Sequence, residues 1–447
     1  MNKYNTIYMS LFKIGLPLIG GNLAMFSLTV VDTAMLGHYN PTALASSVIA
    51  GALFFIIFLF GSGFSFAITP LVAAHDARAE DTQVRIVTRM SFWFCLFYSV
   101  FSFPILYWSK HVLLVLGQPQ EIATLAQSYL RIMSFGLFPA LLDTTLRNYL
   151  AGLKRTNVVL LATVFGVAFK LFTSWLIIFG NLGMPELGIR GAAISTVGVH
   201  TLILLIFIIY AIKFLPRHKL FKNILRFETQ GFSRVFIMGF PIGLTYLAES
   251  GLFSITAVMM GWLGPIELAA HGIAIQLAAI SFMFHLGISQ GATTIIGNAY
   301  GLNHNPMILR RIAIAILSVT ALIAMVAIIL FIYIPRELLE LFIDPKGDPT
   351  GSIIPIGVSL LMIAAIFQLV DGLQAVGLAL LRGLQDVRVP LIYAMISYWG
   401  IGAPTSYIFG FKLGFEAQGI WFGLVSGLTM ASALLLLRFR AKTKCPS

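Results

Sequence analysis

Acidic residues interrupt apolar segments of the chain that are long enough to cross a membrane. Asp371 is the clearest case, because every other residue from Ile353 to Leu381 is apolar or uncharged. Such a run crosses a hydrocarbon core of about 30 Å as a helix that rises about 1.5 Å per residue. Arg382 follows Asp371 by eleven residues, which places the carboxylate roughly 16 Å from that helix end. A charge at this depth costs on the order of 2.5–3.5 kcal/mol, so it requires a partner or a wet cavity.

A second acid is expected at a similar depth. Glu249 follows Arg234 by fifteen residues, which predicts a position roughly 22 Å from the start of its helix. Two carboxylates that meet in a low-dielectric site do not both ionise readily. Glu249 and Asp371 can therefore share a proton, or bind Na⁺ together with other oxygens. The alternative is that both acids only form structural hydrogen bonds.

Composition indicates an all-α, polytopic membrane protein. Of the 447 residues, 58% are hydrophobic and 10% are charged, with a mean hydropathy of +0.92, whereas soluble domains carry about 25% charged residues. No GxxxxGK[ST] loop is present, so we do not expect ATP hydrolysis to drive transport directly. The apolar segments predict twelve transmembrane helices, at 10–37, 42–74, 84–109, 120–152, 157–180, 188–214, 230–261, 265–299, 307–334, 350–381, 387–410 and 415–437.

The basic residues are distributed unequally between the two ends of these segments. If the N-terminus is cytoplasmic, 22 of the 29 Lys and Arg residues lie on the inside, and six lie outside, Lys346 among them. Positive charge collects on the cytoplasmic side of membrane proteins. Both termini are therefore predicted to be cytoplasmic, and the net charge of +12 is explained by topology without a nucleic-acid partner.

The chain also contains an internal repeat. Pro17 matches Pro241 and Pro41 matches Pro265 at a shift of 224, and Gly152 matches Gly383 at a shift of 231. An even number of spans in each copy keeps the orientation, so the copies form parallel repeats. The predicted domains are an N-terminal six-helix lobe (1–214), a basic cytoplasmic linker (215–228) and a C-terminal six-helix lobe (229–447), around a central cavity.

Four motifs together resemble the MATE (multidrug and toxic compound extrusion) family, in its bacterial NorM-like branch. They are VDTAMLGHYNPTALA, LAESGLFS, ELAAHGIAIQ and FQLVDGLQAVGLALLRGLQD. The resemblance implies an antiporter in the bacterial inner membrane that exchanges H⁺ and/or Na⁺ for lipophilic cationic drugs by alternating access. It also implies that Glu249 and Asp371 form the cation site of the C-terminal lobe, and that Asp32 is linked to protons and substrate in the N-terminal lobe.

In this resemblance the N-terminal lobe departs from the family pattern at Lys170, where many relatives carry Asn. A lysine places positive charge where a Na⁺ site needs oxygens, so we do not expect Na⁺ there. We expect instead an Asp32–Lys170 ion pair, near Thr196, that a cationic substrate or protonation of Asp32 breaks. The alternative is that Lys170 extends to the membrane interface. Pro17 precedes Asp32 by fifteen residues and predicts a helix bend, because proline lacks the backbone N–H.

Neutral polar residues are candidates for supporting roles or for the substrate cavity. Gln368 and Gln374 lie three residues on either side of Asp371 and Tyr246 lies three residues before Glu249, spacings that place side chains on neighbouring positions of a helix. Gln276 is a further candidate in the segment 265–299. These residues either orient the acids or pair between helices.

Other polar residues have simpler interpretations. Asp143 precedes Arg147 by four residues and is expected to pair with it. His271 and His285 are interpreted as packing residues, in preference to proton carriers.

The expected cargo is a small amphipathic cation. The 37 Phe and 16 Met residues provide adaptable walls beside a few acids, which suits cation–π attraction and soft packing. We expect a monomer in the lipid bilayer with no cofactor other than the coupling ion. A flippase or exporter of a lipid-linked or endogenous metabolite remains the alternative, and an enzyme is not expected because no metal cluster or nucleophile–base spacing is present.

Overall fold

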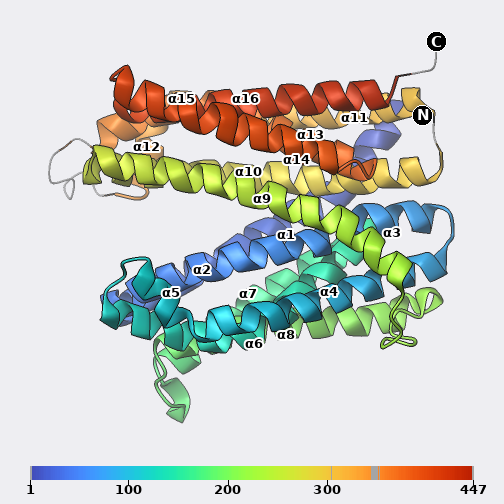
Figure 1. Ribbon diagram of the computed structural model, residues 1–447, viewed down its shortest axis with the longest axis horizontal. Coiled ribbons are helices and arrows are strands. Elements are labelled where there is room, and N and C mark those ends of the chain that lie inside the picture. The colour runs from blue at the N-terminus through green and yellow to red at the C-terminus, as the bar shows by residue number, and fades with distance from the viewer. Residues whose placement is uncertain (1–2, 304, 344–350, 352, 445–447) are drawn as a thin grey trace. The chain divides into compact units, whose positions relative to one another are not determined.

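The computed structural model describes residues 3–303, 305–343, 351 and 353–444, and in these ranges all regular secondary structure is helical (Figure 1). In the first half of the chain the helices are α1 (Lys3–Tyr39), α2 (Pro41–Phe66), α3 (Ile68–Ala77), α4 (Asp81–Tyr107), α5 (Ser109–Val115), α6 (Gln120–Gly152), α7 (Thr156–Ile178) and α8 (Ile189–Phe214). In the second half they are α9 (Thr229–Leu263), α10 (Pro265–Gly301), α11 (Pro306–Tyr333), α12 (Pro335–Glu340), α13 (Ile353–Gly383), α14 (Arg388–Met395), α15 (Ala403–Tyr407) and α16 (Glu416–Lys442).

Eleven helical segments among the described residues are long and apolar enough to cross a membrane. The remaining predicted span, 387–410, is continuously helical from Arg388, but its hydrogen-bond pattern alternates between α14, a π-helical stretch at Ile396–Gly402, α15, and a second π-helical stretch at Ile408–Lys412. Glycine and proline at 400, 402 and 404 weaken a regular ladder there. Residues 350 and 352 of the predicted span 350–381, and Lys346, lie outside the described residues.

Helix starts follow local sequence signals. Asn40 precedes Pro41, and its Oδ1 accepts hydrogen bonds from the backbone N–H groups of Thr42 (2.7 Å) and Ala43 (3.2 Å). Asn305 caps α11 in the same way, accepting from Met307 N at 3.0 Å. Asparagine satisfies N–H groups that the first turn leaves free, and the following proline needs no such partner.

The chain divides into two compact units. One comprises Gly20–Gly243, and the other comprises Met1–Ile19 with Leu244–Ser447. Both boundaries fall inside long helices, two residues after Pro17 in α1 and two residues after Pro241 in α9. The predicted lobes, 1–214 and 229–447, follow the sequence repeat instead, and their boundaries stay a prediction. Pro17 lies inside α1, which is one helix from Lys3 to Tyr39. The bend that the sequence predicts at Pro17 therefore also stays a prediction.

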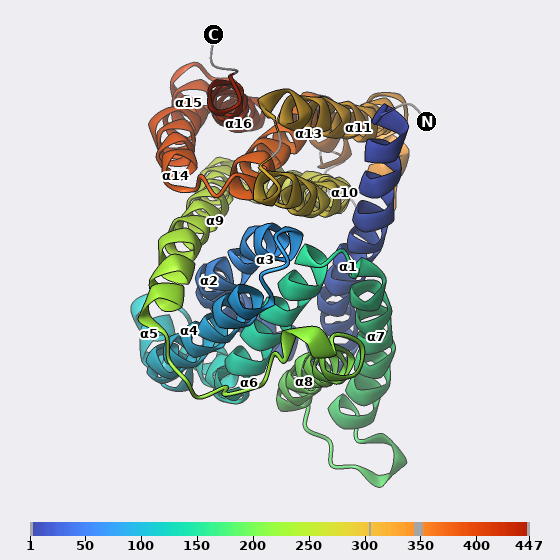
Figure 2. The same ribbon diagram turned by 90° about the vertical axis from the view of Figure 1, so that its right-hand side faces the viewer.

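Corresponding helices of the repeat occupy the centre of each unit. In the unit Gly20–Gly243, α6 packs against α2, α4 and α8 (Figure 2). In the other unit, α13 packs against α10, α11 and α16. The helix that carries Asp371 is therefore surrounded by protein, which explains why an acid is tolerated there.

The linker between α8 and α9 is anchored by a buried histidine. His218 is fully buried, and its Nδ1 lies 2.6 Å from the hydroxyl of Tyr149. Its Nε2 lies 3.3 Å from Asp81 Oδ1, and the neighbouring Arg217 pairs with Asp76. Burial, followed by the positive charge of Arg217, lowers the pKa of His218, although Asp81 and Asp76 act in the opposite direction. His218 is thus neutral at pH 7, so that Tyr149 donates to Nδ1 and the ring proton lies on Nε2.

Acidification is expected to loosen this anchor. A histidine whose pKa is lowered by folding stabilises the folded state fully above its ordinary pKa of about 6.5, and the stabilisation is lost as the pH falls through the lowered value. Hydrogen exchange of residues 213–228, corrected for the intrinsic rate, should therefore accelerate between pH 7.5 and pH 5.5. His218→Gln, which cannot charge, should not show this step; an equal step in the variant would contradict the role of His218.

Candidate ion-coupling and substrate site

A buried ion pair lies inside the unit Gly20–Gly243. Lys170 Nζ on α7 lies 2.7 Å from Asp32 Oδ1 on α1. The ammonium also donates to Thr196 Oγ1 (2.5 Å) and to the backbone carbonyl of Ala192 (3.2 Å), both on α8. Two of the three ammonium protons therefore have hydrogen-bond acceptors on α8, and Asp32 supplies the counter-charge. Lys170 therefore does not extend to the interface.

The two partners of this ion pair differ in exposure. The Lys170 side chain is 1% exposed, whereas that of Asp32 is 21% exposed. Thr196 Oγ1 can also donate to Asp32 Oδ2, at 3.3 Å, and Tyr129 on α6 interacts with both Asp32 and Thr196. The carboxylate is thus the accessible member of the pair, with the lysine behind it.

A second cluster surrounds the acids of the other unit. Asp371 on α13 is 3% exposed and close enough to Glu249 on α9 for their charges to interact. Gln374, one turn after Asp371, lies close enough to Glu249 to interact with its carboxyl group, and it donates to the hydroxyl of Tyr398 at 2.5 Å. Tyr398 lies in the π-helical stretch at Ile396–Gly402. The structure therefore brings Glu249, Asp371 and Gln374 together; the sequence predicted that the two acids could meet and left the role of Gln374 open.

Arg382 joins this cluster, which the sequence did not predict. Its Nη1 donates to the hydroxyl of Tyr246 at 2.7 Å, its guanidinium lies 4.6 Å from the centroid of the Tyr246 ring, and its charge interacts with Glu249. Arg382 was expected only to mark the end of a span. Because Arg382 and Tyr246 are 136 residues apart, no local spacing in the sequence signals this contact.

Several buried oxygens of the second cluster remain available. Among the described residues, none donates a hydrogen bond to Asp371 Oδ1, Gln374 Oε1 or Gln368 Oε1. Unpaired buried acceptors are costly, and carboxylate and amide oxygens are hard ligands. This donor set fits a proton on a carboxylate, a water, or a cation held by oxygen.

The other predicted residues are placed less centrally. Gln368 Nε2 donates to the carbonyl of Ala278 at 3.3 Å. Gln276 on α10 is half-buried and forms no hydrogen bond with the described residues, so nothing links it to the acids. Phe367 packs edge-on against Phe253 and Trp421 and supplies no oxygen.

The sequence predicted that Asp143 pairs with Arg147, but each of them hydrogen-bonds a different residue. His200 Nδ1 on α8 donates to Asp143 Oδ2 at 2.6 Å, and Arg147 donates to Asn22 Oδ1 on α1 at 2.7 Å. Asp143 and His200 are both buried, at 4% and 8% exposure. Asp143 and Arg147 bond partners on other helices and not each other, because α6 is enclosed by other helices on several faces.

The two histidines with packing interpretations differ in their contacts. His271 Nδ1 accepts from Trp421 Nε1 at 3.1 Å. His285 is fully buried against Gly372 of α13, and neither ring nitrogen has a hydrogen-bond partner among the described residues.

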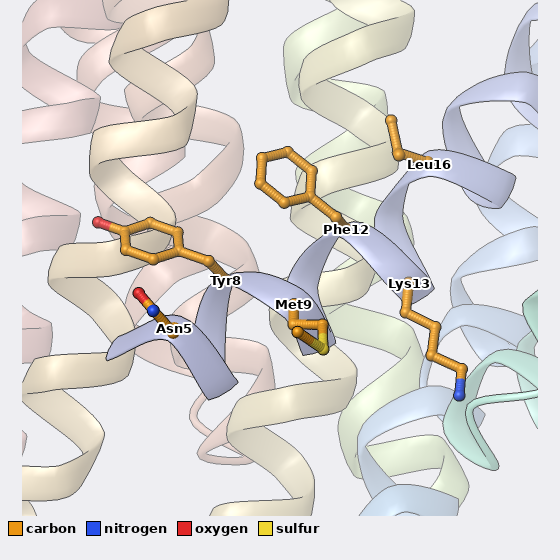
Figure 3. A pocket seen from close by; sticks show the side chains of 6 residues that line it. All are labelled: Asn5, Tyr8, Met9, Phe12, Lys13 and Leu16. Carbon is orange, nitrogen blue, oxygen red and sulfur yellow. The ribbon is translucent and has the colours of Figure 1, made fainter. Parts of the chain in front are cut away.

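A separate shallow pocket of about 560 Å³ lies along the first turns of α1 (Figure 3). Its side chains are mostly apolar, and Tyr8 hydrogen-bonds Ser318 of α11 at 2.9 Å. It is lined by Asn5, Tyr8, Met9, Phe12, Lys13 and Leu16. None of the predicted site residues lines it, so it is distinct from both clusters.

Comparisons with known proteins identify the family. The MatE family model matches residues 17–176 and 241–408. The chain belongs to the MATE family. The two matched segments begin at Pro17 and Pro241, the same spacing that relates the halves of the sequence. The chain is 40% identical over 440 residues to the "Probable multidrug resistance protein NorM" of Rhizobium meliloti, covering 98% of this chain and 94% of the relative.

Solved structures support the fold. One is an outward-facing multidrug resistance MATE family transporter of the MOP superfamily (TM-score 0.89, 18% identity, 98% of this chain and 96% of that chain covered). Another is a MOP superfamily transporter from Pyrococcus furiosus (TM-score 0.87, 18% identity, the same coverage), whose binding pocket is described as having reverse polarity that suggests a different function. The predicted all-α fold with twelve spans and the NorM-like assignment are confirmed. This is a multi-pass membrane protein of a multidrug efflux transporter family.

The Asp32–Lys170 pair predicts an asymmetric loss of stability. Asp32→Asn leaves a buried ammonium without a counter-charge, a change that typically costs about 3–5 kcal/mol. Lys170→Met should cost less, because the more exposed Asp32 can be hydrated. The double variant should recover most of the loss in thermal melting of the purified protein. Losses that simply add in the double variant would contradict the pairing.

Proposed function

We propose that this chain is a proton-coupled antiporter that exports lipophilic organic cations. The observation that carries the proposal is the Asp32–Lys170 pair, in which a tethered cation already occupies the accessible carboxylate. A cationic drug can take the place of the lysine, and a proton on Asp32 can release the drug. Transport then follows because each ligand shifts the conformational equilibrium by its differential affinity.

Protons are favoured over Na⁺ by the ligands around Asp32. A Na⁺ ion needs several oxygen ligands at once, and Lys170 already contacts Oδ1 of Asp32 and Oγ1 of Thr196. A proton needs only one carboxylate oxygen. Phe367 offers no oxygen ligand beside Asp371. The proposed roles are drug and proton binding for Asp32, and proton binding for Glu249 and Asp371.

The proposal predicts which gradient drives efflux. Proteoliposomes containing the wild type should export ethidium, a lipophilic cation, under a pH gradient alone and not under a Na⁺ gradient alone. Glu249→Gln, Asp371→Asn and Asp32→Asn should each abolish most of this efflux, because each removes a carboxylate that binds a proton or the drug. The control is Glu337→Gln, which removes an exposed carboxylate and should transport normally.

Other outcomes decide between the alternatives. Efflux under a Na⁺ gradient alone would refute proton coupling while leaving drug antiport in place. Efflux under neither gradient, with the acid variants no different from the wild type, would refute drug antiport and favour export of a lipid-linked or endogenous metabolite.

Lys170 should set both the affinity for the drug and its release. In Lys170→Asn no tethered cation competes for Asp32, so the KM for ethidium should fall. The maximal rate should fall as well, because no lysine re-forms the pair when the drug leaves. Lys170→Arg, which keeps the charge, should resemble the wild type more closely. Unchanged KM and maximal rate from pH 6 to pH 8 in Lys170→Asn would refute the competition.

A further inference from the structure

The linker between α8 and α9 exposes both basic and apolar side chains. Lys219, Lys222 and Arg226 of the linker are exposed, as is Lys213 at the end of α8. Among the apolar residues, Ile224 is 42% exposed, Leu225 80% and Phe227 46%, and Phe214 at the end of α8 is 59% exposed. Apolar side chains this exposed gain nothing from facing water, whereas a mixture of cations and apolar groups suits a lipid interface.

The linker is held in place by other residues of the same segment. Leu215, His218 and Leu220 are buried. Figure 2 shows the linker running from α8 past α6 and α4 to the start of α9. Arg89 of α4 pairs with Glu228 and donates to the carbonyl of Asn223 at 3.0 Å. The exposed cations are therefore displayed on an anchored segment.

The acids near the linker are already used by the anchor. Asp76 pairs with Arg217, and Asp81 lies against His218. Lys219 and Lys222 form no ion pair with the described residues. Their charges are thus available to an external anion.

The exposed apolar surface continues from the linker onto a membrane-spanning helix. Ile209 and Ile212 in the last turns of α8 are 61% and 59% exposed, and Phe214 follows them. The ammonium of Lys213 lies 5.6 Å from the centroid of the Phe214 ring. A cation beside an exposed aromatic ring at the end of a span is typical of residues at the level of lipid headgroups.

We propose that this linker surface binds the headgroups of anionic phospholipids in the leaflet that it faces, which the charge distribution predicts to be the cytoplasmic one. Lys219 and Lys222 contact the phosphates, and Ile224 and Leu225 insert among the acyl chains near the headgroups. Inorganic phosphate would satisfy the lysines but leave these apolar side chains in water. The proposal is independent of the coupling ion and of the transported drug.

The test places a fluorescent reporter on the linker. An environment-sensitive label is attached at Leu225→Cys in a Cys445→Ala background, because Cys95 is buried. The full-length protein is placed in nanodiscs of phosphatidylcholine with increasing phosphatidylglycerol. The label should shift to the blue as phosphatidylglycerol increases, and added salt should reverse the shift because screening weakens the attraction.

Matched variants test the role of the lysines. Lys219→Gln/Lys222→Gln should need more phosphatidylglycerol for the same shift, by about 25-fold in apparent affinity if each cation contributes about fivefold. Lys219→Arg/Lys222→Arg should respond like the wild type. The control Arg190→Gln/Lys412→Gln removes two exposed cations from the opposite predicted side and should also respond normally.

Three results would overturn the proposal. The first is an equal response in the Lys219→Gln/Lys222→Gln variant and the wild type. The second is an equal loss in the control variant. The third is the same blue shift when inorganic phosphate is added to pure phosphatidylcholine nanodiscs, which would indicate phosphate binding alone. Because none of these measurements uses efflux, their failure is distinguishable from failure of the proposed antiport.

Discussion

The burial of Lys170 constrains much of the unit Gly20–Gly243. An ammonium that is 1% exposed among membrane-spanning helices requires both a counter-charge and acceptors for its protons. Asp32 supplies the charge from α1, and Thr196 and Ala192 supply acceptors from α8. One side chain therefore connects three helices, and the pair carries no net charge. Any change that separates Asp32 from Lys170 must provide each with a new partner, and a proton or an organic cation is suited to do so.

The other unit balances its acids differently. Glu249 and Asp371 interact with each other, with the neutral Gln374 and Tyr398, and with Arg382 near the end of α13. Among the described residues no ion pair joins Arg382 to either acid, so no cation is as close to them as Lys170 is to Asp32, and acceptor oxygens on Asp371 and Gln374 receive no hydrogen bond there. The two halves of a repeated sequence have thus acquired different electrostatics. In the first a lysine contacts the carboxylate directly, whereas the second keeps oxygens available for a proton or water beside a more distant arginine.

The fold itself does not decide what is transported. The chain superposes on solved transporters at 18% identity, one of them a multidrug resistance transporter and another with a pocket of reverse polarity. Function is determined by the charges placed on such a scaffold. In this chain the informative residue is the lysine at position 170, where many members of the family that the motifs resemble carry Asn.

The sequence by itself determined the features that depend on distance along one helix. Run length predicted the spans, the repeat predicted matching halves, and residue counts placed Glu249 and Asp371 at similar depth, so that their meeting was anticipated. Only the tertiary structure decided the partners between helices. It paired Asp143 with His200, brought Arg382 to Tyr246, left Gln276 apart, and introduced π-helical stretches into the segment 387–410. The physical reason is that helical periodicity specifies which side chains share a face, whereas contacts such as Lys170 with Asp32 depend on how separate helices pack, which spacing within one helix does not encode.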